Sequence, residues 1–507
     1  MDTRTSIAPH ATEICTLPFL VPDYVNGDFA VREYHNFIDG AFAPSPKGDR
    51  IIVTNPSTGE AIATAPESTA ADLDRALEAA TAAGPAWARL PAIQRAAPLR
   101  AIARLIRENA EALARLITEE QGKILPLARI EVNFTADYMD YMAEWARRIE
   151  GEIIESDRAN ETIFLFRQPI GVIGGILPWN FPFFLIARKA APALVCGNTI
   201  VIKPSEETPC NAHEFCRLVE RAGLPKGVFN LISGRGSTVG NALASSEKLG
   251  MVSFTGSVET GSRVMAAASK NVTKVNLELG GKAPAIVLAD ADIALAARAI
   301  RDSRVINTGQ VCNCAERIYV HERVKDEFVG RLVTEMRRTK YGNPLLDENV
   351  EMGPLINEAG FRKVDAMVKE AIAGGAEALT GARRGEGRNG FFYEPTVLLN
   401  CRHEMPVMRR EIFGPVAPVA TFSDLDEAIA LANDCEFGLT SSIYTSDIRA
   451  AMRACHEIRF GETYINRENF EAMQGFHAGW RKSGIGGADG KHGLYEFLQT
   501  HVVYMQH

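Results

Sequence analysis

The sequence has neither an excess of basic residues nor a cysteine framework. Among its 507 residues, 55 Lys and Arg stand against 63 Asp and Glu, which gives a formal net charge of −8. A mildly acidic chain without a basic block is a poor partner for a polyanion, so we expect no nucleic-acid binding. Nine cysteines in a chain of this length are typical of intracellular proteins rather than of secreted disulfide scaffolds.

Long apolar runs are also missing. The N-terminal run at 17–22 is too short for a secretory signal, contains two prolines and follows Glu13. Three prolines and three glycines interrupt the uncharged stretch 169–187, which indicates a buried strand, a turn and a helix start rather than a membrane span. We therefore expect a soluble, cytoplasmic protein with no membrane partner.

Several common site motifs are incomplete. Each of the four His-Glu pairs lacks a second histidine at the spacing of a zinc helix, and Cys312 and Cys314 have no second cysteine pair nearby, so no metal site is predicted. There is no G-x-S-x-G nucleophile motif, and 486–492 is not a complete phosphate-binding loop. The glycine loop 234–240 is one residue longer than the dinucleotide fingerprint and is a weak signal on its own.

Hydrophobic periodicity divides the chain into distinct regions. Residues 1–34 lack a clear period and are interpreted as an N-terminal extension, whereas 71–125 repeat apolar residues at helical spacing. Between about 170 and 290, short β-rich runs alternate with helical segments, which predicts a parallel, doubly wound α/β sheet. The predicted strands are 171–177, 199–202, 228–232, 251–254 and 274–277, and the predicted helices are 183–194, 208–222, 237–246 and 258–269.

A second alternating series runs from residue 285 to about 480. Its predicted strands include 285–288, 317–320, 416–422 and 441–444. The chain ends in a β-rich stretch at 499–505, which we expect to pair with the chain's own body or with another subunit. Two sheet-bearing halves predict a ligand-binding cleft between them.

Four segments carry residues suited to chemistry. They are 177–182 with Asn180 between two prolines, 277–282 with Glu278 before a glycine pair, 307–312 with Cys312 behind a glycine, and 411–415 with Glu411. Taken singly, each has a structural explanation, such as a turn or a core cysteine. Together, in this order, they resemble the aldehyde dehydrogenase superfamily from about residue 36 onward.

The resemblance implies an α/β fold with two doubly wound α/β domains and a β oligomerisation arm. It assigns 35–148 and 170–284 to an NAD-binding domain and 285–484 to a catalytic domain. Residues 149–169 and 485–507 become oligomerisation elements, so a homo-oligomer, specifically a tetramer, is expected.

The residues themselves suit aldehyde oxidation. A thiolate that adds to the carbonyl forms a tetrahedral carbon able to expel hydride, and Cys312 is the candidate nucleophile. Asn180 and the backbone N–H of Cys312 are candidate oxyanion donors. Glu278 is a candidate general base for hydrolysis of the resulting thioester. Cys314 is an alternative nucleophile, although the family motif places the thiol at Cys312.

The resemblance also assigns a nicotinamide cofactor site. Lys203 and Glu206 match the pair that holds the adenosine ribose, and a carboxylate there disfavours a 2′-phosphate, so NAD is expected over NADP. The family's variant glycine loop accounts for the extra residue after Gly236. The remaining matched positions are Trp179 and Ser257 near the pyrophosphate, Glu411 and Phe413 near the nicotinamide, and the backbone of Leu279 near the carboxamide.

Polar residues occupy positions that line the substrate tunnel of the family. Arg188, Asn313, Glu471 and His477 would make burial of an alkyl chain costly and would suit a small hydroxylated aldehyde. The stretches 466–477 and 313–317 resemble the lactaldehyde and glycolaldehyde dehydrogenase branch of the family.

Other readings of these residues stay open. Arg188 and Glu471 could pair as structural ions, or Arg188 could grip the carboxylate of succinic semialdehyde or another semialdehyde. A coenzyme-A-acylating enzyme is a further alternative, which the presence of Glu278 disfavours. Intact Cys312, Glu278 and Asn180 argue against a non-enzymatic role.

Overall fold

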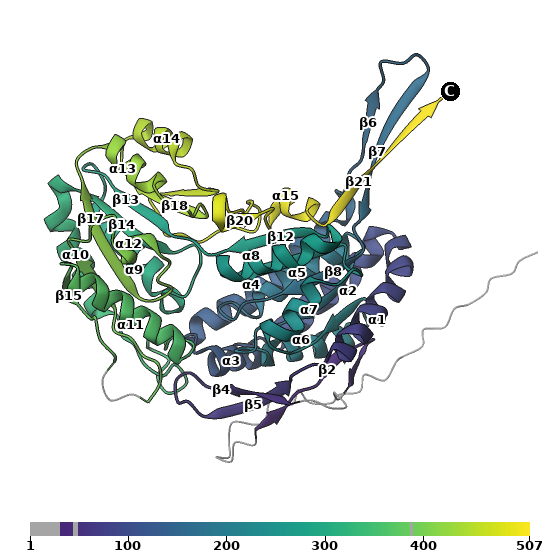
Figure 1. Ribbon diagram of the computed structural model, residues 1–507, viewed down its shortest axis with the longest axis horizontal. Coiled ribbons are helices and arrows are strands. Elements are labelled where there is room, and N and C mark those ends of the chain that lie inside the picture. The colour runs from purple at the N-terminus through teal and green to yellow at the C-terminus, as the bar shows by residue number, and fades with distance from the viewer. Residues whose placement is uncertain (1–30, 44–48, 386–388) are drawn as a thin grey trace, which may run out of the picture. The chain divides into compact units, whose positions relative to one another are not determined.

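The computed structural model describes residues 31–43, 49–385 and 389–507, which form two large and two small β-sheets with flanking helices (Figure 1). The predicted extension 1–34 lies outside the described residues except at its end. There, β1 (Arg32–Glu33) pairs in parallel with β5 (Ala61–Pro66), so the folded body begins before residue 34. Every helix in the described part of the chain is too short or too polar to cross a bilayer.

The first large sheet has eight strands and a parallel centre. Its order is β20 (Gly484–Ile485), β12 (Lys274–Leu279), β11 (Met251–Gly256), β8 (Val172–Ile176), β9 (Thr199–Lys203), β10 (Phe229–Leu231), β2 (Asn36–Ile38) and β3 (Ala41–Ala43). The five strands from β12 to β10 are parallel, which confirms the predicted doubly wound sheet. Buried apolar runs in β8 and β9 are typical of parallel strands that are covered on both faces. The antiparallel edge strands β2, β3 and β20 were not predicted.

Helices of the first half follow the predicted pattern with local breaks. They are α1 (Ala70–Arg89), α2 (Ala92–Glu108), α3 (Ala110–Gln121), α4 (Leu125–Glu144), η1 (Trp145–Arg147), α5 (Phe184–Val195), α6 (Cys210–Arg221), η2 (Gly236–Gly240), α7 (Asn241–Ala244), α8 (Val258–Ala268) and η3 (Ser269–Asn271). Pro91 precedes α2 and Asn109 separates α2 from α3, so the helical region 71–125 is three helices. The segment predicted as helix 237–246 is a π-helical turn followed by one short helix.

The second large sheet has seven strands. Its order is β15 (Glu377–Thr380), β16 (Thr396–Leu399), β17 (Val416–Phe422), β14 (Ala315–His321), β13 (Ala283–Val287), β18 (Thr440–Tyr444) and β19 (Glu462–Ile465), all parallel except β15. Its helices are α9 (Ile293–Val305), η4 (Ile306–Gly309), η5 (Glu322–Val324), α10 (Lys325–Arg338), α11 (Glu358–Ala373), α12 (Pro406–Arg409), α13 (Leu425–Asn433) and α14 (Ile448–Glu457), and η6 (Arg481–Ser483) and α15 (Gly490–Tyr495) follow.

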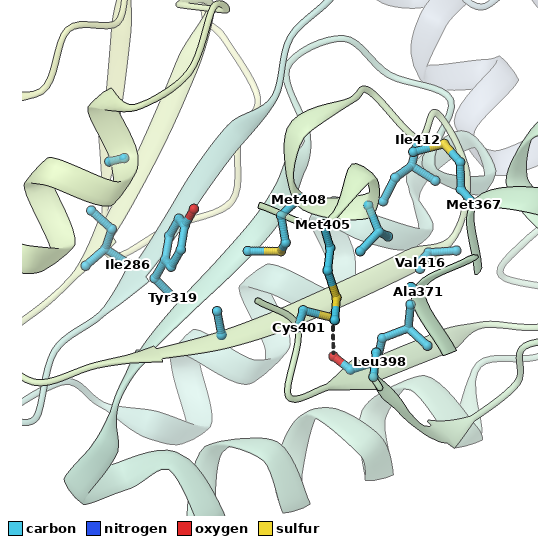
Figure 2. Close-up of a cluster of buried hydrophobic side chains, with 14 of the residues drawn as sticks. Ile286, Tyr319, Met367, Ala371, Leu398, Cys401, Met405, Met408, Ile412 and Val416 are labelled. Atoms are coloured by element: carbon cyan, nitrogen blue, oxygen red, sulfur yellow. Dashed lines mark hydrogen bonds between the residues drawn. The ribbon is translucent and has the colours of Figure 1, made fainter. Parts of the chain in front are cut away.

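One core of the second half supports a loop of the site directly. Figure 2 shows side chains from α11, such as Met367, beside strand residues such as Val416 and the loop residue Ile412. Ile412 is fully buried in this cluster and lies between Glu411 and Phe413 in the chain. Burial of one apolar side chain therefore anchors the segment that carries two candidate cofactor residues.

The C-terminal strand belongs to a three-stranded arm. β21 (Leu498–Gln506) pairs antiparallel with β7 (Glu161–Pro169), which also pairs with β6 (Glu152–Glu155) (Figure 1). The second small sheet consists of β1, β5 and β4 (Arg50–Thr54). Ile485 lies in β20 of the first large sheet, so of the predicted element 485–507 only the part from Leu498 onward forms the arm. Oligomerisation through the arm stays a prediction, which the 66% exposed Tyr504 and 76% exposed Ile153 suit.

The two large sheets meet at a short link. β12 ends at Leu279 and β13 begins at Ala283, so Gly280, Gly281 and Lys282 pass directly from one sheet to the other. The carboxyl ends of β8, β11 and β12 and the amino ends of β13, β14 and β17 therefore face one region. In doubly wound sheets, ligands bind at the carboxyl ends of the strands where the strand order reverses, which here is between β8 and β11.

Candidate active site

A pocket of about 250 Å³ opens where the two sheets meet, and it brings most of the predicted site residues together. Its lining includes all three catalytic candidates, all four substrate candidates and five of the cofactor candidates. These residues are Cys312, Glu278 and Asn180; Arg188, Asn313, Glu471 and His477; and Trp179, Ser257, Leu279, Glu411 and Phe413. Lys203, Glu206 and Gly236 are not among the lining residues; Lys203 ends β9, next to β8 in the sheet.

Cys312 lies in a constrained loop between η4 and β14. Asn307, Thr308 and Gly309 all have positive φ, at 46°, 61° and 73°, which is costly for the two residues that have a side chain. Side chains hold this turn in place: the Thr308 hydroxyl donates to the Gly353 carbonyl at 3.0 Å, and the amide of Gln310 donates to the Asn307 carbonyl at 3.0 Å. The loop thereby presents the half-buried Cys312 to the pocket.

Cys314, the alternative nucleophile, is buried away from the pocket. Its sulfur lies 3.0 Å from the Val311 carbonyl and 3.0 Å from Nη1 of Arg304. Burial raises the pKa of the Cys314 thiol to about 12, so it is a poor source of thiolate. The geometry favours Cys312 as the nucleophile.

Asn180 is fixed through both its side chain and its backbone. Its Nδ2 donates to the Gln310 carbonyl at 3.0 Å, which leaves the second Nδ2 hydrogen for the pocket. Its backbone carbonyl accepts a 2.8 Å hydrogen bond from Nζ of Lys123, whose buried ammonium also pairs with Glu131. Glu131 in turn accepts the backbone N–H of Phe183 at 2.9 Å, so the turn that carries Asn180 is held at several points.

Glu278 is a buried carboxylate without hydrogen bonds. It is the penultimate residue of β12, and neither of its carboxylate oxygens has a hydrogen-bond partner among the described residues. Burial raises the pKa of Glu278 to about 7, although the positive charges of His477, Arg188 and Lys189 oppose the shift. A carboxyl group that titrates near neutrality and faces a pocket is suited to general acid–base work.

His477 is held on its backbone and on its ring. Its backbone pairs with Ala488 through two hydrogen bonds of 2.9 and 2.8 Å. Its Nε2 lies 3.4 Å from a carboxylate oxygen of Glu278, and its Nδ1 lies 2.5 Å from Glu462. The imidazole lines the same pocket as Cys312, and its charge lowers the pKa of that thiol, although burial raises the pKa overall.

Arg188 is neutralised by two carboxylates. Its Nη2 lies 2.9 Å from Glu471, so the two residues do form the ion pair considered from the sequence, and its Nε lies 3.1 Å from Asp489. Glu471 also accepts a hydrogen bond of 2.5 Å from Nδ2 of Asn313. Asp489 was missed because its contact with Arg188 spans 301 positions and its segment resembled only a failed phosphate loop.

The pocket also has an aromatic wall that was not predicted from the sequence. Four phenylalanines also line the pocket, namely Phe134, Phe181, Phe184 and Phe470. Phe134 packs on Phe184 with ring centroids 4.8 Å apart, and the Arg188 guanidinium lies 5.0 Å from the Phe184 ring. The pocket thus has one aromatic wall and one charged wall, and the helical pattern that carries Phe134 resembled ordinary core packing.

The cofactor candidates fit a dinucleotide. Nζ of the buried Lys203 pairs at 3.0 Å with Glu206, whose side chain is 39% exposed and therefore accessible to a ligand. The backbone N–H of Gly236 points to the same carboxylate at 3.4 Å. Lys203 holds the pKa of Glu206 below its usual value in spite of burial. Ser257 caps the N-terminus of α8, where backbone N–H groups favour a phosphate.

The nicotinamide end of the site is equally well ordered. Burial raises the pKa of Glu411 to about 7, and its carboxylate accepts the Gly281 N–H at 3.0 Å. A Cβ at Gly280 would lie 2.6 Å from the same carboxylate, so a larger residue there would displace the Glu411 side chain. The rings of Trp179 and Phe413 meet edge to face, with centroids 5.5 Å apart.

Comparison with known proteins agrees with this geometry. A family model described as the aldehyde dehydrogenase family matches residues 42–503. The chain belongs to the aldehyde dehydrogenase family. The family resemblance and the fold class expected from the sequence are thereby confirmed.

Individual aldehyde dehydrogenases match along almost the whole chain. Lactaldehyde dehydrogenase of Escherichia coli is 59% identical over 93% of this chain and 98% of that enzyme, and its crystal structure superposes with a TM-score of 0.93 over 94% and 100% of the two chains. A 3,6-anhydro-α-L-galactose dehydrogenase of a Vibrio species is 42% identical over 94% of this chain and 99% of that enzyme. A Staphylococcus aureus betaine aldehyde dehydrogenase, solved in complex with NAD+, is 37% identical with a TM-score of 0.91 over 93% and 94% of the chains.

We predict that Asp489→Ala destabilises this aldehyde dehydrogenase by about 3 kcal/mol, because a buried guanidinium would lose one of its two carboxylate partners. Urea unfolding followed by tryptophan fluorescence measures the loss. Asp426→Ala, which breaks the exposed pair with Arg453, is the control and should change stability by less than about 1 kcal/mol. Equal effects of the two substitutions would contradict a structural role for the Arg188–Asp489 pair.

Proposed function

We propose that this aldehyde dehydrogenase oxidises a small hydroxyaldehyde, lactaldehyde or glycolaldehyde, to the carboxylic acid with NAD. The observation that carries the proposal is an unpaired acceptor beside the nucleophile. Oδ1 of the buried Asn313 has no hydrogen-bond partner among the described residues, and Asn313 follows Cys312 directly and lines the pocket. A buried acceptor without a donor is costly, and a substrate hydroxyl would satisfy it.

The relatives support the same substrate class. The E. coli enzyme that is 59% identical to this chain is a lactaldehyde dehydrogenase. The semialdehyde alternative has less support, because both Glu471 and Asp489 already neutralise Arg188. A third carboxylate, on the substrate, would compete with these two for one guanidinium.

The chain's own residues account for the chemical steps. The Cys312 thiolate attacks the aldehyde carbon, and the oxyanion that forms accepts hydrogen bonds from Nδ2 of Asn180 and the backbone N–H of Cys312. The nicotinamide cofactor, when bound, accepts the hydride that this tetrahedral carbon expels. Glu278 then removes a proton from the water that hydrolyses the Cys312 thioester, which releases the acid and restores the thiol.

Residues from both large sheets would hold the cofactor. Lys203 and Glu206 would bind the adenosine ribose, Trp179 and Ser257 the pyrophosphate, and Glu411 the nicotinamide ribose. The backbone of Leu279 and the ring of Phe413 would border the nicotinamide, and Gly236 of the glycine loop adjoins the Glu206 carboxylate. The accessible carboxylate of Glu206 supports NAD over NADP, because it would repel a 2′-phosphate.

We expect the substrate hydroxyl to be recognised through Asn313. Glycolaldehyde and acetaldehyde differ by that hydroxyl, as do lactaldehyde and propanal, so each pair isolates its contribution. The kcat/KM for NADH formation should be about tenfold or more higher for the hydroxylated member. Asn313→Leu, which keeps the volume but removes the acceptor, should reduce that preference and leave kcat/KM for acetaldehyde and propanal nearly unchanged.

The same assay distinguishes the alternatives. A higher kcat/KM for succinic semialdehyde than for either hydroxyaldehyde would contradict the proposal and favour a semialdehyde dehydrogenase. A preference for hexanal would show that the aromatic wall, not Asn313, selects the substrate.

Cofactor choice should depend on Glu206. We predict that Glu206→Ala raises the NADP to NAD ratio of kcat/KM by about tenfold, because it removes a charge that repels the 2′-phosphate. The control is Glu207→Ala, whose carboxylate binds Asn357 at 2.9 Å instead of Lys203. An unchanged ratio in Glu206→Ala would argue against this residue as the selector.

Thioester hydrolysis should follow the ionisation of Glu278. The pKa of Glu278 is raised to about 7, so the group is a protonated acid below that pH and a carboxylate above it. Because only the carboxylate can act as base, we predict that the hydrolysis rate rises through a midpoint near pH 7. Quenched-flow measurement of acylated Cys312 tests this.

The isosteric variant Glu278→Gln should accumulate acylated enzyme and lose that pH dependence. Glu404→Gln, an exposed carboxylate paired with Arg402, should keep the wild-type profile. A wild-type midpoint in Glu278→Gln would assign the titrating base to another group.

A further inference from the structure

Glu462 lies outside the residues that line the pocket and yet contacts one that does. It begins β19, the edge strand of the second large sheet, and its side chain is 15% exposed. One carboxylate oxygen lies 2.5 Å from Nδ1 of His477, and the other accepts the hydroxyl proton of Tyr464. The contact therefore joins a strand at the edge of the sheet to a side chain in the pocket.

His477 lies between Glu462 and the pocket, so the charge of Glu462 can influence the nucleophile through the imidazole. The imidazole is 2% exposed, and its backbone is paired with Ala488, so the ring has little freedom to turn away. With Glu462 on Nδ1, the ring's remaining nitrogen, Nε2, lies 3.4 Å from a carboxylate oxygen of Glu278, and the ring lines the same pocket as Cys312. This order of carboxylate, imidazole and thiol is that of an activated nucleophile.

We propose that Glu462 is a positioning residue that holds His477 as an imidazolium against Cys312, so that the three side chains act together to stabilise the thiolate. The inference rests on the proposed function in one respect, since it takes Cys312 as the nucleophile. Glu462 acts only through His477 and does not touch the reacting atoms.

The charges around His477 agree with this arrangement. Glu462 from β19, Glu278 from β12 and Glu471 from the preceding loop favour the imidazolium, and Arg188 from α5 opposes it. Burial lowers the pKa of His477, but the carboxylates outweigh this and hold it well above its usual value. For Cys312, burial raises the thiol pKa above its usual value, whereas the positive charge of His477 lowers it. His477 is thus the main group that favours the thiolate.

The proton count separates this role from that of a general base. The imidazolium keeps both of its N–H protons, the one on Nδ1 donated to Glu462 and the other on Nε2, and the proton of the thiol leaves to solvent. When the thiolate adds to the aldehyde, its electron pair forms the C–S bond and the carbonyl electrons move to oxygen. His477 neither gains nor loses a proton in that step.

The rate at which iodoacetamide alkylates Cys312 reports the thiolate directly, without cofactor or substrate. The full-length enzyme is treated between about pH 5.5 and about pH 9.5, and mass spectrometry follows carbamidomethylation of the peptide that contains Cys312. We expect Glu462→Gln to slow alkylation at pH 7 about tenfold and to move the midpoint up by about one pH unit. Glu462→Asp, which keeps the carboxylate, should restore a midpoint near that of wild type.

Two further variants separate positioning from a general effect on the fold. Glu404→Gln removes an exposed carboxylate that pairs with Arg402, and the Cys312 midpoint should not move. His477→Gln should raise the midpoint as Glu462→Gln does, and the double variant should show no further shift, because both act through one imidazole. Additive shifts would overturn the proposal, and His477→Gln alone tests the coupling to Cys312 if Glu462→Gln does not fold.

Failure of the inference differs from failure of the proposed function. If Cys312 is alkylated with loss of NADH formation but Glu462→Gln leaves the midpoint unchanged, Glu462 has no positioning role and the nucleophile stands. If complete alkylation of Cys312 leaves NADH formation intact, the nucleophile assignment is wrong and the inference fails with it.

Discussion

The carboxylate of Glu316 holds together the three segments from which the pocket is built. It binds Nζ of Lys282 at 2.7 Å, on the link between the two sheets, and the backbone N–H groups of Ile412 and Phe413 at 2.9 and 3.0 Å. Glu316 itself lies four residues after Cys312. Burial opposes ionisation, but Lys282 and Arg304 hold the pKa of Glu316 below its usual value, so the carboxylate stays charged. A buried charge that is fully paired and hydrogen-bonded fixes geometry, and here it fixes the nucleophile loop relative to the cofactor loop.

Some polar groups of the pocket are paired with other side chains, and others are left for a ligand. On the substrate side, Arg188 and His477 are matched by carboxylates, so the local charges are balanced before any ligand enters. Within the part of the chain that the structure describes, the carboxylate of Glu278 and Oδ1 of Asn313 line this pocket without a hydrogen-bond partner. In a buried site, an unpaired polar atom discriminates strongly between ligands. A ligand that forms a hydrogen bond with this atom gains binding free energy, whereas an analogue without the matching group leaves the atom unpaired. The proposed preference for a hydroxyaldehyde is thus a consequence of which atoms the fold leaves unsatisfied.

Local sequence patterns predicted the scaffold well. The strand 416–422 appears with its predicted bounds, and the parallel centre of the first sheet follows the predicted alternation of strands and helices. Apolar periodicity determines such elements, and it is visible within a short window of sequence. The edge strand β20 was missed because it has two residues and exists only through pairing with β12.

Some site residues could likewise be predicted from local motifs, whereas others depend on contacts between distant parts of the chain. The motifs identified Cys312, Glu278 and Asn180, and all three line the pocket. Each lies near the end of a strand or in a turn whose position the fold determines. Asp489 and Glu462 could not be found from the sequence, since their importance lies in contacts with Arg188 and His477. The sequence around an acidic residue does not indicate which distant residue it will bind. Most acidic residues are exposed to solvent, so an acidic residue alone does not predict a buried contact.

The short segment from Gly484 to Asp489 shows how closely the site depends on the rest of the fold. Its first two residues form β20 and complete the first sheet, Ala488 pairs with the backbone of His477, and Asp489 binds Arg188. Asp489 has a φ of 70° and a ψ of 163°, a conformation that is costly for any residue except glycine. Such strain persists only where surrounding contacts outweigh it, and the ion pair with the buried guanidinium is the contact that does so here. The same chain continues through α15 into β21, so the residues that order the substrate side of the pocket are covalently continuous with the arm.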